Sequence, residues 1–201
     1  MEFFLAGLVF PVVDTLSALA VVCQIFSVIL AILLIRNRSS KIADVISGQG
    51  MLLMLIIAFT ASTGSLFFSE VAGWAPCKLC WFQRIFMYPQ VLLLGYAVWK
   101  HKKSIFPYIL GLCVIGMSIS AFHYVEQILA MLSPSEVLAP CDMSGVSCSA
   151  TYILSYGYIT IPMLAFTAFL ANALLSFTCM RMNSDNRTPK IIPITAIVVF
   201  L

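Results

Sequence analysis

Five long apolar stretches constrain the fold of this chain more than any other feature of its sequence. They lie at residues 16–35, 45–68, 81–99, 104–130 and 158–180, and each is long enough to cross about 30 Å of hydrocarbon. Of the 201 residues, 62% are hydrophobic and 9% are charged, whereas a soluble domain carries about 25% charged residues. A soluble fold of this size could not bury so much apolar side chain, so a lipid bilayer must solvate much of the chain.

Each stretch is predicted to be a helix, because an unpaired backbone amide in lipid costs several kcal/mol and the sequence has no β-barrel pattern. The predicted fold class is therefore all-α and polytopic, with five membrane-spanning helices. The N-terminus has neither the basic region nor the cleavage site of a signal peptide. Residues 1–10 are expected to form a short interfacial helix that ends near Pro11.

Basic residues predict the orientation, since nine of the eleven Lys and Arg residues fall in three alternate loops. They are Arg36, Arg38 and Lys41 after the first stretch, Lys100, Lys102 and Lys103 after the third, and Arg181, Arg187 and Lys190 after the fifth. The positive-inside rule places these loops in the cytoplasm. The N-terminus and the loops at 69–80 and 132–157 are then expected outside. Residues 191–201 are apolar but too short to span, and they form either an interfacial segment or the start of a sixth span of a longer protein.

Cysteine positions follow this division. The external loops hold Cys77, Cys80, Cys141 and Cys148, and the predicted spans hold Cys23, Cys113 and Cys179. Disulfides persist in the oxidising space outside the membrane, so the external pairs indicate thiol–disulfide chemistry. The three cysteines within spans are interpreted as small packing residues.

The first pair is a CxxC motif at the predicted start of a helix. The positive end of the helix dipole would stabilise a thiolate there, and Lys78 and Arg84 add positive charge. Arg84 lies one turn beyond Cys80, at a depth that marks it as a functional candidate, although it could also extend to the lipid headgroups. Cys141 and Cys148 could form a static disulfide, but the CxxC pair offers them an exchange partner.

Residues 77–84 read Cys-Lys-Leu-Cys-Trp-Phe-Gln-Arg and resemble the signature of the DsbB/BdbC family of disulfide-forming membrane proteins. The loop 141–148 with the following 157–162, and the segment 123–126, are similar to the BdbC-like branch. The resemblance covers roughly residues 45–180.

This resemblance implies a four-helix transmembrane bundle, to which the first span adds one N-terminal helix. It divides the chain into an external segment and added helix at 1–44, the bundle with two cysteine loops at 45–180, and a cytoplasmic loop with a further apolar segment at 181–201.

The resemblance also implies an enzyme that supports disulfide bond formation in a bacterial inner membrane. Cys141 would exchange with a soluble DsbA-like thioredoxin-fold oxidase outside the membrane, and the mixed disulfide would resolve through Cys148 and Cys77. Electrons would reach Cys80 and pass to ubiquinone or menaquinone from the membrane pool. No nucleic acid partner is expected.

Arg84 would hold and polarise a carbonyl of the quinone in this family mechanism. Gln83 and His123 are further candidates for hydrogen bonds to the cofactor, and no metal is expected. Three alternatives stay open. These are a vitamin K epoxide reductase-like enzyme, a non-enzymatic thiolate site for a soft metal, and a reaction that runs in the reducing direction.

Overall fold

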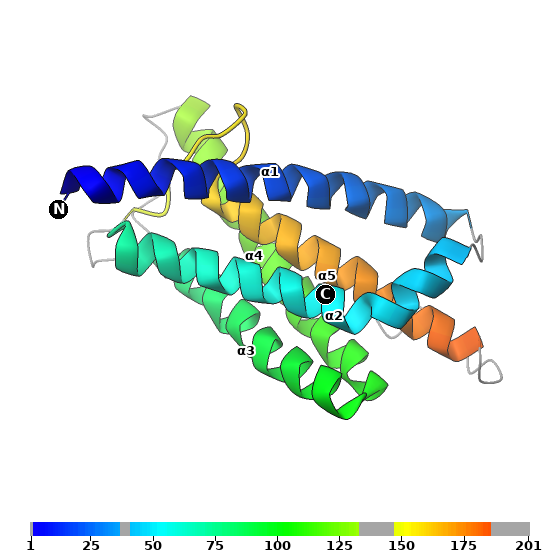
Figure 1. The fold of residues 1–201 in the computed structure, drawn as a ribbon. Coiled ribbons are helices and arrows are strands. Elements are labelled where there is room, and N and C mark those ends of the chain that lie inside the picture. The colour runs from blue at the N-terminus through cyan, green and yellow to red at the C-terminus, as the bar shows by residue number, and fades with distance from the viewer. Residues whose placement is uncertain (1, 37–40, 133–146, 186–201) are drawn as a thin grey trace.

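The computed structural model describes residues 2–36, 41–132 and 147–185 (Figure 1). These residues form five long helices, α1 (Glu2–Ile35), α2 (Lys41–Leu66), α3 (Lys78–Lys100), α4 (Phe106–Leu132) and α5 (Ile161–Asp185). A π-helical turn, Phe67–Val71, follows α2, and a short 3₁₀ helix, Lys103–Ile105, precedes α4. Cys141 and the apolar segment 191–201 lie outside the described residues.

The expected count of five membrane spans is wrong. Four helices among the described residues are long and apolar enough to cross a membrane, namely Val9–Ile35, Gln49–Val71, Lys103–Leu132 and Ile161–Met182. The predicted span 81–99 lies in α3, which is a shorter helix and is not one of the four. The reason is its polar content, because Gln83, Arg84 and Gln90 lower its hydropathy and are buried inside the bundle.

The expected break at Pro11 is also wrong. Helix α1 runs without interruption from Glu2 to Ile35 and contains Pro11. A proline inside a helix removes one backbone hydrogen bond, and neighbouring side chains can compensate for such a break in an apolar helix. The Thr15 hydroxyl donates a hydrogen bond to the Pro11 carbonyl, and the helix continues through this position.

Helix α5 lies at the centre of the bundle, where it contacts α1, α2 and α4 (Figure 1). The fully buried Phe169 of α5 packs its ring against Gly116 of α4, and a Cβ atom at Gly116 would collide with that ring. A polar contact joins the helices in the same core, since the Asn172 amide donates to the Gln90 side-chain oxygen at 3.1 Å. Close approach at small residues and hydrogen bonds between helices are how transmembrane helices associate.

The two ends of the bundle differ in chemistry. At one end, Arg181 donates to the Leu34 carbonyl at 3.3 Å and Ser176 donates to the Phe106 carbonyl at 2.6 Å, which joins α1, α4 and α5. This "basic end" holds basic residues in the last turns of α3 and α5 or just after α1 and α3, which are Arg36, Lys100, Lys102, Lys103 and Arg181. The opposite "cysteine end" holds Cys77, Cys80 and Cys148.

Candidate functional site

The CxxC pair sits where the chain enters α3. Gly73, with φ 70°, turns the chain after the π-helical turn, and Cys77 then caps the helix in an extended conformation. The Cys77 sulfur accepts a hydrogen bond from the Cys80 backbone N–H at 3.4 Å. The two sulfurs are 3.1 Å apart, about 1 Å farther than in a disulfide. The sequence prediction of a CxxC pair at a helix N-terminus is therefore confirmed, and the structure describes the pair in its reduced form.

The two thiols have opposite acidities. The hydrogen bond from the Cys77 thiol lowers the pKa of Cys80, and a backbone hydrogen bond and the charge of Arg84 act in the same direction against burial. Donating that hydrogen bond, together with burial, raises the pKa of Cys77 to about 12. In the reduced pair, Cys80 is thus the more acidic thiol and Cys77 the less acidic one. A thiolate is the nucleophilic and electron-donating form of cysteine.

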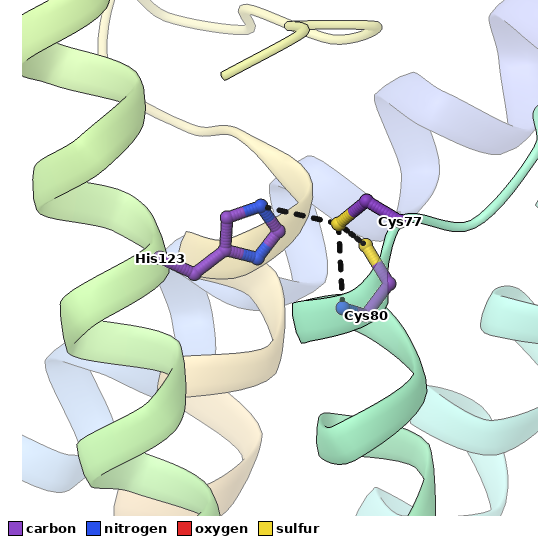
Figure 2. Close-up of side chains that lie close together, drawn as sticks. All are labelled: Cys77, Cys80 and His123. Atoms are coloured by element: carbon purple, nitrogen blue, oxygen red, sulfur yellow. Dashed lines mark hydrogen bonds between the residues drawn. The ribbon is translucent and has the colours of Figure 1, made fainter. Parts of the chain in front are cut away.

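His123 of α4 connects the CxxC pair to the second cysteine loop (Figure 2). The Gln83 amide nitrogen lies 2.9 Å from His123 Nδ1, and because an amide nitrogen only donates, Nδ1 must accept. The proton of the neutral ring is then on Nε2, which lies 3.0 Å from the Cys148 carbonyl oxygen and 3.6 Å from the Cys77 sulfur. His123 and Gln83 are both buried, so protein groups rather than bulk water set this hydrogen-bond pattern.

Cys148 completes the described part of the cysteine cluster. It is 1% exposed, and it lies close enough to Cys80 that negative charge on Cys148 would oppose ionisation of Cys80. Three of the four cysteines predicted to be catalytic are therefore gathered at the cysteine end. Cys141 lies outside the described residues.

Arg84 is held one turn deeper by a residue that the sequence did not single out. Its Nε donates to the Ser65 hydroxyl at 3.0 Å and its Nη2 donates to the Ser65 carbonyl at 2.9 Å. Tyr88 also donates to the Ser65 hydroxyl, at 3.4 Å, and the guanidinium lies 5.2 Å from the centre of the Trp81 ring. Ser65 lies near the end of the second apolar stretch, and nothing in its local sequence connects it to an arginine 19 residues later.

A cavity of about 440 Å³ opens beside this cluster. Its walls come mostly from apolar residues of α1, α2, α3 and α5, and its polar lining includes Cys80, Gln83 and Arg84. The rings of Phe68, Trp74 and Tyr152, which also line it, are stacked with centroid distances of 5.2 and 5.4 Å. His123 faces the other way, toward Cys77 and Cys148.

Helix α1 forms one wall of this cavity through residues that include Leu16, Cys23 and Phe26. Gln24 fixes the helix in place, because its amide nitrogen donates to the Thr167 hydroxyl at 3.0 Å and its oxygen accepts from the Tyr158 hydroxyl at 2.9 Å. Both partners are more than 130 residues away in the chain. The sequence pattern therefore carried no signal for this contact.

Comparison with known proteins identifies the family. Residues 48–179 match the family model described as "Disulfide bond formation protein DsbB". The chain is 44% identical to disulfide bond formation protein C of Bacillus subtilis over 125 residues, which are 62% of this chain and 86% of the relative. It is 42% identical to the probable disulfide formation protein C of Halalkalibacterium halodurans over 143 residues, which are 71% of this chain and 98% of the relative.

No solved structure matches the chain. The family match covers all of α3 and α4 and most of α2 and α5, whereas α1 precedes it. With a family model matched over more than half of its length and four candidate membrane spans, the chain is a multi-pass membrane protein that belongs to the DsbB family of disulfide bond formation proteins.

Proposed function

We propose that this protein is a thiol:quinone oxidoreductase that reoxidises a soluble thioredoxin-fold dithiol oxidase and passes the electrons to a membrane quinone. The observation that carries the proposal is the position of Cys80. Its pKa is the lower of the CxxC pair, and it lines the apolar cavity together with Arg84. The more acidic thiol of the pair thus adjoins a site of the right chemistry for an apolar, carbonyl-bearing acceptor.

The residues around the cavity fit a quinone ring. Pockets for small molecules are mostly apolar with a few placed polar groups, which describes this lining. Ser65 takes two of the five N–H donors of the Arg84 guanidinium, which leaves donors for a carbonyl oxygen in the cavity. When bound, the quinone supplies an acceptor for two electrons and two protons. Arg84 would stabilise negative charge that develops on its oxygen.

The thiol steps follow the order of the cysteines. A thiolate of the partner attacks the Cys141–Cys148 disulfide, and the second partner thiol closes the partner's own disulfide. The reduced loop cysteine Cys148 then attacks Cys77 of the Cys77–Cys80 disulfide, which breaks that bond and releases Cys80 as the thiolate. Cys141 then attacks Cys148 of the Cys77–Cys148 disulfide. This step restores the Cys141–Cys148 disulfide and leaves the CxxC pair reduced by two electrons.

His123 is better placed for this exchange than for contact with the quinone. The sequence led us to expect a hydrogen bond from His123 to the cofactor, but its Nε2–H points to the Cys148 carbonyl and the Cys77 sulfur. We infer that it holds Cys148 near Cys77 and stabilises negative charge on the Cys77 sulfur. Gln83, which lines the cavity and donates to His123, fixes the tautomer that this role requires.

The orientation that we propose follows from the two ends of the bundle. The basic end gathers Arg and Lys residues at or near the C-terminal ends of α1, α3 and α5, which by the positive-inside rule favours the cytoplasm. The cysteine end would then face the external, oxidising side of a bacterial inner membrane, where a soluble oxidase can reach it. The quinone pool of the same membrane would have access through the apolar walls of the cavity.

Turnover of the purified protein tests the proposed function. With a reduced thioredoxin-fold partner and a soluble ubiquinone or menaquinone analogue, we expect the wild type to form quinol and partner disulfide in a ratio of one to one. Cys141→Ser should lose at least about 99% of this rate, because the partner's entry disulfide cannot form. Cys179→Ser, which alters a buried cysteine against Gly50 near the basic end, is the matched control and should retain the rate. A wild type that is inert with both quinone classes would refute the function.

Gln24→Leu tests whether α1 forms a wall of the quinone site. Leucine has a similar size but cannot make the hydrogen bonds to Thr167 and Tyr158. We expect the KM for quinone to rise about fivefold to tenfold, the equivalent of one net hydrogen bond, with the KM for the partner unchanged. Gln49→Leu, at an exposed site on α2, is the matched control. A rise in KM for the partner alone would show that α1 has no part in the quinone site.

A further inference from the structure

The reduced CxxC pair and His123 bring three metal-ligand atoms together. The sulfurs of Cys77 and Cys80 and an imidazole nitrogen of His123 all lie within 4.8 Å of one another (Figure 2). Cys77 and His123 are buried, and Cys80 is half-buried. His123 lies 46 residues after Cys77 on another helix, so no local sequence pattern places its ring against the Cys77 sulfur.

The distances can be compared with those of a tetrahedral zinc site. Zn–S bonds of about 2.3 Å and Zn–N bonds of about 2.0–2.1 Å place two sulfurs about 3.8 Å apart and a sulfur about 3.6 Å from a nitrogen. In the structure, the Cys77 sulfur is 3.1 Å from the Cys80 sulfur and 3.6 Å from His123 Nε2. A rotation of one cysteine side chain that widens the sulfur pair by about 0.7 Å would bring the distance between the two sulfurs to the value of a zinc site.

We propose that the reduced CxxC pair and His123 form a binding site for zinc or a similar thiophilic divalent cation. Binding replaces the two thiol protons, which are released to solvent, with one cation. Two thiolates and a divalent cation have no net charge, so the complex suits this buried position better than two free thiolates would. A water molecule takes the fourth ligand position.

His123 can bind a metal ion through Nε2 because the Gln83 amide can rotate to match the new position of the ring proton. A metal ion on Nε2 requires the ring proton to be on Nδ1, where the Gln83 amide now donates. Rotation of the Gln83 amide by about 180° presents its oxygen to that proton, which gives the usual outer hydrogen bond of a metal-bound histidine. The same Gln83–His123 pair thus supports both the metal-free and the metal-bound states.

Zinc would therefore inhibit only the reduced form of the protein and not the oxidised form. Thiolates bound to zinc are not available to exchange with Cys148 or to donate electrons, whereas the Cys77–Cys80 disulfide offers no thiolate to the metal. This inference goes beyond the proposed function and does not depend on it, because metal binding is measured without a quinone or a partner.

Cobalt substitution under anaerobic conditions tests the site. We expect one Co²⁺ per reduced protein to give the charge-transfer and visible bands of tetrahedral thiolate coordination, and one equivalent of Zn²⁺ to remove them. Oxidised protein should give neither. His123→Asn should weaken Zn²⁺ binding at least about tenfold, while His101→Asn, which changes the other histidine at an exposed position with φ 51°, should not. Unchanged cobalt bands and affinity in His123→Asn, or equal binding by the oxidised protein, would overturn the proposal.

A measurement on the wild type tests the metal site without relying on the folding of the His123→Asn variant. One equivalent of Zn²⁺ should slow alkylation of Cys77 and Cys80 at least about tenfold, as read by mass spectrometry of the reduced protein. Alkylation of Cys23 in the wall of the cavity should be unchanged. Equal protection of all cysteines, or none for the CxxC pair, would also refute a metal site at His123.

Discussion

Cys80→Ser is expected to abolish quinone reduction, with a fall in rate of at least about 1,000-fold. A serine hydroxyl does not ionise at neutral pH and cannot form a disulfide. The residue that lines the cavity therefore loses its electron-donating group. Cys77 cannot replace it, because its pKa is raised to about 12 and its side chain faces His123. Quinol formation with saturating reduced partner measures the effect.

Partner exchange separates a lost electron donor from a lost fold in this variant. The Cys141–Cys148 disulfide does not involve Cys80, so one round of exchange with the reduced partner should proceed at the wild-type rate and then stop. Cys113→Ser, a change of a buried cysteine in α4, is the matched control and should keep full turnover. Quinone reduction by Cys80→Ser at more than about a tenth of the wild-type rate would remove Cys80 from the proposed electron path.

Local sequence features predicted the parts of the site that depend on neighbours in the chain. The CxxC spacing and the following apolar helix place Cys77 as the N-cap of α3 and Cys80 in its first turn, as the structure confirms. Arg84 follows from the same helix, since four residues make about one turn. The span count was wrong in this same helix. The interpretation as a span accepted Arg84 and gave no weight to Gln83 and Gln90, and the structure buries all three side chains.

Contacts between distant parts of the chain could not be predicted from one sequence. Ser65 binds Arg84 from the end of α2, and Gln24 binds Thr167 from across the bundle. His123 was identified as a candidate, but its position beside Cys77 rather than in the cavity depends on how α4 packs. The role of Cys141 and the division of the chain at residues 45 and 180 stay predictions.

Arg84→Lys is expected to lower kcat/KM for quinone by about 10-fold to 100-fold, while exchange with the partner stays within about twofold of wild type. Lysine keeps the charge but loses the planar set of donors that binds the Ser65 hydroxyl and carbonyl and still faces the cavity. One charge-assisted hydrogen bond of about 1.5–3 kcal/mol accounts for the expected loss.

Two half-reactions measured on the same Arg84→Lys sample decide between a quinone-binding role and a structural one. Quinone reduction by chemically reduced protein reports the cavity, and mixing of oxidised protein with the reduced partner reports the cysteine end. Arg181→Lys is the matched control, because it makes the same change at the basic end, where Arg181 donates to the Leu34 carbonyl. An equal fall in both half-reactions would mean that Arg84 supports the CxxC helix through Ser65 rather than acting on the quinone. Unchanged quinone reduction would exclude Arg84 from the site, and the polar end of the cavity would then need another donor to bind a carbonyl.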